Sequence, residues 1–337
     1  MAILANGQPT LADAAALTTD SGAAVTIAEL LEQTNPAFND IPWEEANSTT
    51  GHKVSARQKL PETYLRRINQ GIRPSKSGYG SVLESAGLFN ALGQVDAKLV
   101  ELAVDKARFR FIENKGHIES MGQRFFQSML YGDPNVVPED FLGIAPRYAS
   151  LAAADRTAVQ IIDAGGTGSD LTSIYLVGWG EGSVMGFYPK GTTAGIKHVP
   201  LPQAMIDDGS GGKYLGFEDW FDLNAGIAVS DYRNIVRIAN IDVSDLQAGD
   251  PITGITAGAK LINLMTMALE QLNNPNGLNP VFYVPRVVST FMRLQIQNKA
   301  NVWLSTREIA GKKVTDFDGV PVRRMDAISL NETRVVV

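Results

Sequence analysis

Residues 95–131 carry the pattern that most constrains the fold, because their apolar side chains recur every three or four positions. The members of this stripe are Val95, Leu99, Leu102, Phe109, Ile112, Ile118, Met121, Phe125 and Met129. The spacing predicts one long helix with Asp96 as its N-cap and a stop at 132–134 (Gly-Asp-Pro). At 1.5 Å per residue it would be ~54 Å long. A long amphipathic core helix and the spine of a flat, laterally associating subunit both fit this pattern.

Composition removes several classes of protein. The chain has no cysteine, which excludes disulfides, thiolate zinc sites and cysteine nucleophiles. Its three histidines, His52, His117 and His198, lie far apart in the sequence and provide little material for a metal site. No apolar run approaches the ~18 residues of a membrane span, and the N-terminus lacks signal-peptide features. We therefore expect a soluble protein with no membrane partner and no secretion signal.

The segment 51–80 is the most charge-biased part of the chain, with seven basic residues against one acidic residue. The basic residues are Lys53, Arg57, Lys59, Arg66, Arg67, Arg73 and Lys76. Interspersed prolines and glycines predict a long loop or ribbon instead of a helix. Such a ribbon, with Tyr64 and Tyr79, could bind phosphates or lie across an acidic edge of a neighbouring copy. The segment has a net charge of +6 and the whole chain has −6, so the rest of the chain carries −12. This acidic remainder favours the neighbouring copy as the partner.

The N-terminal part has the composition of an arm. Residues 1–24 are polar and rich in Ala and Thr, and Thr26 is a candidate cap for a short helix that ends at 35–36. An apolar patch that includes Trp43 follows. An arm that reaches a partner and a segment that packs on its own domain are both compatible with this sequence.

Two glycine-rich stretches resemble phosphate loops but fail on spacing or context. GGTGSD at 165–170 is followed by a second strand at 173–177, whereas a dinucleotide fingerprint must open a helix. In the stretch 207–214, Asp207 occupies the first glycine position of a Walker loop and Tyr214 replaces the Ser or Thr. We found no catalytic dyad, nucleophile elbow or metal-spaced histidines. The sequence therefore predicts no enzymatic activity, no cofactor and no metal.

The remaining chain reads as a mixture of strands and helices. Predicted strands cover 159–162, 174–179, 183–188, 227–241 and 281–284, predicted helices cover 257–272 and 285–299, and Asp318-Gly319 marks a hairpin. The fold class is α+β, with mainly antiparallel pairing.

Several stretches, taken in order, resemble the major capsid protein of tailed bacteriophages, in particular a type found in short-tailed phages such as those of Bordetella. They are NPAFNDIPW at 35–43, LP at 60–61 with 66–76, MLYGD at 129–133, FLGIA at 141–145, GGTGSD at 165–170, WG at 179–180, YPKG at 188–191, GIAV at 226–229 and DYRNIVRIANI at 231–241. The resemblance runs from about residue 25 to the end and rests on the number and order of these matches.

The resemblance implies the Hong Kong 97-type capsid fold. It assigns an N-terminal arm to 1–45, an extended loop to 46–92, a peripheral domain with its spine helix to 93–139 and 166–250, and an axial domain to 140–165 and 251–337. The strand-rich stretch 170–245 precedes the axial segment, whereas the usual order is the reverse, so the connectivity looks permuted.

The resemblance also implies a function. Copies would form hexamers and pentamers that close into an icosahedral shell around double-stranded DNA, held without sequence specificity. Scaffold, portal, and decoration or cement proteins are further implied partners, and assembly would occur in the cytoplasm of the host bacterium. Trp43 and the seven basic residues are the expected intersubunit contacts. An encapsulin-like nanocompartment, a nucleotide-binding enzyme and a nucleic-acid-binding module remain alternatives.

Overall fold

The structure is a computed structural model that describes residues 35–49, 51–103, 105–207, 211–248, 259–273, 277–297, 304–309 and 312–337. These residues fall into two compact units. Among them, unit 1 holds 87–126 and 193–225, and unit 2 holds 35–86, 127–192 and 226–337. The predicted arm at 1–24 and the short helix after Thr26 lie outside the described residues. No helix within the described ranges is both long enough and apolar enough to cross a membrane.

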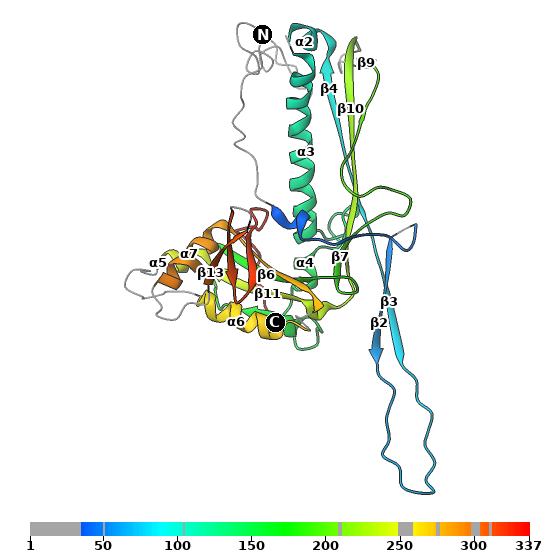
Figure 1. Cartoon of the computed structure of the whole chain (residues 1–337), viewed down its shortest axis with the longest axis vertical. Coiled ribbons are helices and arrows are strands. Elements are labelled where there is room, and N and C mark those ends of the chain that lie inside the picture. The colour runs from blue at the N-terminus through cyan, green and yellow to red at the C-terminus, as the bar shows by residue number, and fades with distance from the viewer. Residues whose placement is uncertain are drawn as a thin grey trace. The chain divides into compact units, whose positions relative to one another are not determined.

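Unit 1 is a twisted antiparallel ribbon with a long helix along it (Figure 1). Its elements are β4 (Gly87–Asp96), α2 (Ala97–Leu102), most of α3 (Lys106–Tyr131), β8 (Lys197–Pro200), β9 (Ala204–Asp207) and most of β10 (Lys213–Val229). β4 pairs with β10 from Gly87 opposite Ala225 to Asp96 opposite Gly216, and β8 and β9 also pair with β10. Alternate strand residues face α3, where the Phe89 and Phe125 rings meet edge to face at 6.0 Å.

The predicted 95–131 helix is wrong at its start. Val95 belongs to β4, and Asp96 ends that strand before it caps α2 by accepting a hydrogen bond from the Lys98 amide at 2.7 Å. The cap is therefore confirmed, but α2 ends after Leu102, where Ala103 takes an extended conformation with ψ of 135°. A 3.6-residue period ran through all of these elements because residues from each of them pack into one small core.

The longer helix, α3, starts with a second acidic residue. The Asp105 carboxylate accepts a hydrogen bond from the Arg108 amide at 3.0 Å, which satisfies a first-turn N–H. The helix ends at Tyr131, directly before Gly132, as predicted. Its 26 residues span ~39 Å at 1.5 Å each, instead of the predicted ~54 Å.

Asp219 lies at the centre of a buried polar cluster in unit 1. Its carboxylate receives two hydrogen bonds from Arg110, at 2.9 and 2.8 Å, and a contact from His198 at 2.8 Å. His198 also stacks on Phe221, with ring centroids 4.8 Å apart. Burial alone would raise the pKa of Asp219, but the hydrogen bonds from Arg110 and His198 outweigh it and hold this pKa below its usual value.

Unit 2 is built on a mixed sheet. Its elements are η1 (Pro36–Asn39), β1 (Trp43–Glu45), β2 (His52–Lys59), β3 (Gly78–Glu84), α4 (Ile144–Arg147), η2 (Ala158–Gln160), β5 (Ile161–Asp163), β6 (Leu171–Trp179), β7 (Val184–Tyr188), η3 (Tyr232–Asn234), β11 (Ile235–Asp242), α5 (Val243–Ala248), α6 (Leu261–Gln271), β12 (Asn279–Val284), α7 (Arg286–Gln297), β13 (Leu304–Ile309), β14 (Lys312–Phe317) and β15 (Val320–Arg324). β6 and β11 are buried along their whole length and pair with each other antiparallel. β12 pairs with β6 and leads through β15 and β14 to β13.

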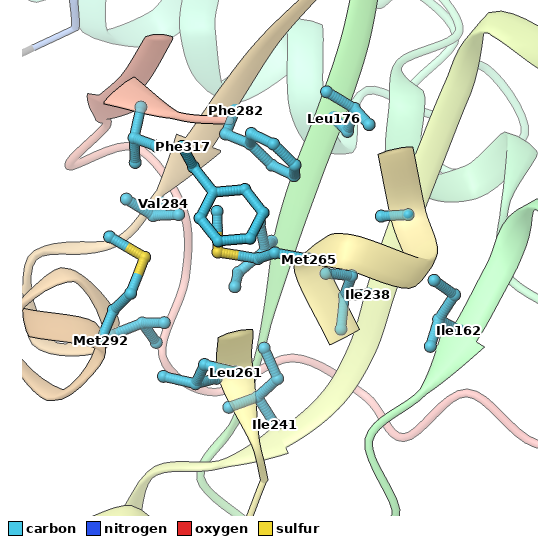
Figure 2. Packing of buried hydrophobic residues seen from close by; sticks show 14 of the residues in the cluster. Ile162, Leu176, Ile238, Ile241, Leu261, Met265, Phe282, Val284, Met292 and Phe317 are labelled. Atoms are coloured by element: carbon cyan, nitrogen blue, oxygen red, sulfur yellow. The ribbon is translucent and has the colours of Figure 1, made fainter. Parts of the chain in front are cut away.

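The core of unit 2 lies between this sheet and two helices. Figure 2 shows Leu261 and Met265 of α6 facing Ile238 and Ile241 of β11, and these side chains are completely buried. The Phe282 and Phe317 rings meet edge to face at 6.0 Å in the same cluster. Burying each such side chain stabilises the fold by ~1.5–3 kcal/mol, so this cluster is the main source of stability for the unit.

Several predicted elements of unit 2 differ in their bounds, among them the 159–162 strand, where Val159 and Gln160 belong to η2 and β5 starts at Ile161. The predicted 227–241 strand is broken by η3, because the Asp231 carboxylate accepts from the Arg233 amide at 3.0 Å and turns the chain there. α6 begins at Leu261, four residues later than predicted, and α7 ends at Gln297, with Lys299 outside the described residues. The hairpin at 318–319 is confirmed: Asp318 and Gly319 have φ of 49° and 79°, as a type I′ turn requires.

The last residues of the chain are held to unit 2 by a buried ionic network. Glu332 receives a hydrogen bond from Arg237 at 2.7 Å, from Tyr131 at 2.5 Å and from Tyr175 at 3.1 Å, and it also contacts the Ser173 hydroxyl. The side chains of Arg237 and Glu332 are each only 5% exposed. Arg237 donates further to the backbone carbonyls of Ala145 and Tyr148, so its charge is well compensated.

Candidate assembly surface

The basic segment folds as the predicted ribbon. β2 and β3 pair antiparallel from His52 opposite Glu84 to Lys59 opposite Gly78, and the segment 60–77 joins them without regular structure (Figure 1). We call β2, β3 and 60–77 the basic ribbon. Of the described residues between 60 and 76, all are exposed, so this part of the ribbon contributes nothing to the core of its own subunit.

Three predicted contact residues lie on the paired strands. Lys53 is exposed, and its backbone is fixed by Asn47, whose side-chain oxygen accepts from the Lys53 amide at 2.7 Å. The Arg57 guanidinium lies over the Tyr79 ring, 5.5 Å from its centroid, and donates to the Tyr79 hydroxyl at 3.3 Å. Lys59 ends β2 with its side chain exposed. These contacts order the strands and leave the cationic groups accessible.

The other four basic residues, Arg66, Arg67, Arg73 and Lys76, lie exposed along the joining segment. A turn closes after Arg67, whose carbonyl accepts from the Gln70 amide at 3.2 Å, with Asn69 at φ of 68°. Tyr64 donates a hydrogen bond to Glu62, and this bond raises the pKa of Tyr64. The structure therefore brings all seven predicted cations onto one ribbon.

The structure places Trp43 apart from the ribbon cations. It belongs to β1, which pairs parallel with β7, opposite Gly186. The Trp43 side chain is half-buried, and its ring stacks with Phe38 at 6.0 Å. In the isolated chain this residue packs on its own unit, and its contact with a neighbouring copy stays a prediction.

Aliphatic side chains interleave with these cations, and the sequence analysis missed them. Leu60, Leu65, Ile68 and Ile72 are 70%, 103%, 89% and 56% exposed. Apolar side chains exposed together mark an interaction site. A usable signal was present, because each of these four residues stands beside Pro, Gly or Arg in a segment that its prolines and glycines predict to be a loop.

The glycine turn at 165–170 is a connection between strands and offers no phosphate cradle. Its amides are already bound by carboxylates of the same unit: Gly165 donates to Asp163 at 2.8 Å and Gly168 to Asp242 at 3.0 Å. The turn joins β5 to β6, as predicted. The second glycine-rich stretch leads at Lys213 into β10, a strand, whereas a Walker loop leads into a helix.

A cavity of about 390 Å³ lies in unit 2, where the parallel strands β12 and β15 begin. Its wall includes the Asp40–Arg323 ion pair, at 2.9 Å, and Tyr283 donates to Asp40 at 3.0 Å. Burial raises the pKa of Asp40, against the opposing effect of Arg323. The wall holds no histidine, serine or lysine, and no group of three potential metal ligands occurs in the described part of the chain. The pair is a structural contact.

Comparison with known proteins identifies the family. The sequence model of major capsid protein GP7 matches residues 19–336. The chain belongs to this capsid protein family. A search of curated proteins returned no match.

Solved structures give the fold. The capsid structure of bacteriophage epsilon15 is similar at 29% sequence identity and a TM-score of 0.76, over 99% of each chain. The bacteriophage JBD30 capsid is similar at 9% identity and a TM-score of 0.51, over 90% of this chain and 93% of that one. An encapsulin complex from Synechococcus elongatus PCC 7942 matches more weakly, at 10% identity and a TM-score of 0.42, over 64% of this chain and 92% of that one.

The protein is therefore a major capsid protein of a bacteriophage, with the Hong Kong 97-type α+β fold. The capsid family and the fold class expected from the sequence are thereby confirmed. The narrower likeness to capsid proteins of Bordetella phages and the permuted connectivity stay predictions.

Proposed function

We propose that copies of this chain assemble as hexamers and pentamers into an icosahedral shell that encloses double-stranded DNA. The family supports a shell of identical subunits. The basic ribbon supports the way in which subunits are joined, because it exposes cations and aliphatic side chains together along 60–77. In this proposal the ribbon of one copy docks on a neighbouring copy, with Trp43 as a further contact.

The composition of the ribbon suits docking onto protein. In every copy, the residues outside 51–80 carry a net charge of −12. Attraction between this charge and the seven basic residues of a neighbour's ribbon therefore steers association. The aliphatic residues then contribute ~1.5–3 kcal/mol for each side chain that becomes fully buried. Side-chain ordering offsets part of this gain. Many such modest contacts, repeated around a shell, give a stable particle from weakly associating subunits.

The roles of the chain segments belong to the same proposal. The arm is 1–45, the extended loop 46–92, the peripheral domain 93–139 and 166–250, and the axial domain 140–165 and 251–337. The net charge of −6 suits a shell that holds DNA without binding it tightly. We further propose assembly in the host cytoplasm, with scaffold, portal, and decoration or cement proteins as partners, and a structural role without enzymatic activity.

Charge reversal in the ribbon tests this proposal. In Arg66→Glu/Arg67→Glu, each docked ribbon would place two anions against an acidic neighbour, at a cost of several kcal/mol. Since 1.4 kcal/mol is a factor of ten, each contact should weaken more than tenfold. Electron microscopy and sedimentation should show wild-type protein in closed shells and the variant as small species. Both exposed residues lie outside any core, so circular dichroism should be unchanged.

A matched control separates the ribbon from overall charge. Arg156→Glu/Lys190→Glu reverses two exposed cations elsewhere in unit 2 and should still form shells. Shells from the ribbon variant at wild-type yield would overturn the docking role, as would loss of its folded circular dichroism. The nucleic-acid content of wild-type particles, made in the presence of the packaging machinery, distinguishes a DNA-filled shell from a nanocompartment.

A further inference from the structure

The basic ribbon is embedded in unit 2 only at its base. Val54 is buried in a cluster with Met185 and Phe187, and the His52 ring lies 5.5 Å from the Phe187 ring. The partner strand is exposed on both faces even at this level, where Val82 opposite Val54 and Leu83 opposite Lys53 are 58% and 55% exposed. The direction in which the ribbon leaves the unit is therefore set by a few residues at its base.

The contact at the base with the most hydrogen bonds is a buried ion pair. Glu84, the last residue of β3, accepts two parallel hydrogen bonds from Arg147. They run from Nη1 to Oε1 and from Nη2 to Oε2, and each is 2.7 Å long. The two side chains are 6% and 13% exposed. A planar guanidinium fork fixes direction as well as distance, which a single ammonium contact does not do.

Arg147 is itself held in place. It ends α4, and its Nε donates to the Gly143 carbonyl at 3.2 Å while Nη2 donates to the Leu142 carbonyl at 3.0 Å. Ile144, the first residue of α4, and Tyr148, directly after Arg147, are 1% and 0% exposed. All three nitrogens of the guanidinium are thus used, and the group has no alternative position without losing hydrogen bonds.

The opposite strand is fixed at the same level. Gly51 directly precedes β2 with φ of 156°, and a Cβ on it would lie 2.2 Å from the Glu84 carbonyl oxygen. The backbones of Gly51 and Glu84 are therefore in direct contact. This contact and the Glu84–Arg147 pair hold both strands of the ribbon in place at its base, so the ribbon resembles a lever that is fixed at this end.

The length of the ribbon amplifies any movement at this point. At ~3.3 Å per residue the chain from Ser55 to Arg67 spans up to about 40 Å, so a rotation of ~10° at the base moves the tip by about 7 Å. That displacement is more than twice the ~3 Å length of a hydrogen bond. We propose that Glu84 and Arg147 are positioning residues for assembly, which aim the ribbon at its docking surface before a neighbouring copy arrives. This inference rests on the proposed docking role of the ribbon.

The absence of cysteine allows a direct test on unassembled full-length subunits, because two introduced cysteines are the only thiols. Spin labels are placed at Glu181→Cys, an exposed turn residue after β6, and at either Ser81→Cys near the base or Thr63→Cys far along the ribbon. Pulsed electron resonance then gives the distribution of label distances. The backgrounds are wild type, Glu84→Gln, which removes the charge, and Arg147→Lys, which keeps the charge but removes the fork. Glu101→Gln, which breaks the exposed Lys98–Glu101 pair in unit 1, is the control.

In both base variants we expect the 181–63 distribution to become at least twice as broad, the 181–81 distribution to broaden less, and the control to match wild type. This dependence on distance from the base is the signature of a lever, which a general loss of stability would not produce. Unchanged distributions in both variants would overturn the inference, as would equal broadening at both labels. Loss of folded circular dichroism in both variants would also overturn it, because the pair would then serve folding.

The shell assay keeps the two proposals apart. If Arg66→Glu/Arg67→Glu assembles normally, the docking role fails, whatever the label distances show. If the ribbon cations matter but the base variants keep narrow distances, only the positioning role fails. With both roles in place, Glu84→Gln and Arg147→Lys should assemble at least tenfold more slowly than wild type.

Discussion

Removing one partner of the Arg237–Glu332 pair should be among the most destabilising single changes in unit 2. Glu332→Leu leaves the Arg237 guanidinium buried at 5% exposure, with only Ser173 and two backbone carbonyls to bind. An uncompensated charge of this kind costs ~3–5 kcal/mol. Arg237→Met leaves Glu332 charged, although Tyr131 and Tyr175 still donate to it, and it also strips the donor from both carbonyls. We expect a similar loss for that variant.

The double variant Arg237→Met/Glu332→Leu supplies the control, because it removes both charges and fills their volume with apolar atoms. Its loss should be smaller than the sum of the two single losses by at least ~2 kcal/mol, since neither charge is left alone. Urea unfolding can follow the fluorescence of Trp179, which is completely buried in β6 of the same unit. At a slope of ~2 kcal/mol/M, each single variant should lower the midpoint by about 2 M.

Additive losses would refute this reasoning, because they would show that the two groups act independently. A loss below about 1 kcal/mol in Glu332→Leu would refute it differently, by showing that water or the nearby hydroxyls replace the carboxylate.

Two further predictions concern local features. Hydrogen bonds from Arg110 and His198 keep the folded-state pKa of Asp219 below its unfolded value, so its stabilisation is complete above the unfolded pKa of ~3.9 and is lost as the pH falls through the folded pKa. Melting temperatures of Asp219→Asn should therefore fall less between pH 5 and pH 2.5 than those of wild type, and parallel curves would contradict this. Gly319→Ala places a Cβ at φ of 79° and should cost ~1–2 kcal/mol in urea unfolding. Gly116→Ala is the opposite control: it lies in α3 with open space around its Cβ position and should stabilise by up to ~1 kcal/mol, so a loss there would be unexpected.

Local chemistry made part of this fold predictable. The ribbon followed from charge and from Pro and Gly placement, the hairpin from Asp318-Gly319, and the end of α3 from Gly132. The break after α2 was not visible, because Val95 of the strand and Leu99 and Phe109 of the helices share one core and so maintain a helical period. β10 was missed over 213–226, since Gly216, Asp219 and Asn224 have low strand propensity and only pairing with β4 makes that stretch extended.

Contacts between residues far apart in the sequence were the second part of the structure that the sequence could not predict. Glu84 and Arg147 are 63 positions apart, and Arg237 and Glu332 are 95 apart, with no periodic signal to join them. The ribbon cations were identified because they cluster in sequence, whereas the residues that fix the ribbon base are brought together only by the fold.

The Glu332 network also has a consequence for the timing of synthesis. Tyr175 meets a partner that is translated 157 residues later, an interval of roughly 8–30 s at ~5–20 residues per second. Until Glu332 has been translated, Arg237 lacks its carboxylate partner. A nascent chain that ends before Glu332 therefore cannot complete the fold of unit 2. A partly synthesised subunit could therefore expose the basic ribbon before unit 2 is folded. Incorporation into a shell would be restricted to chains that have been translated through Glu332.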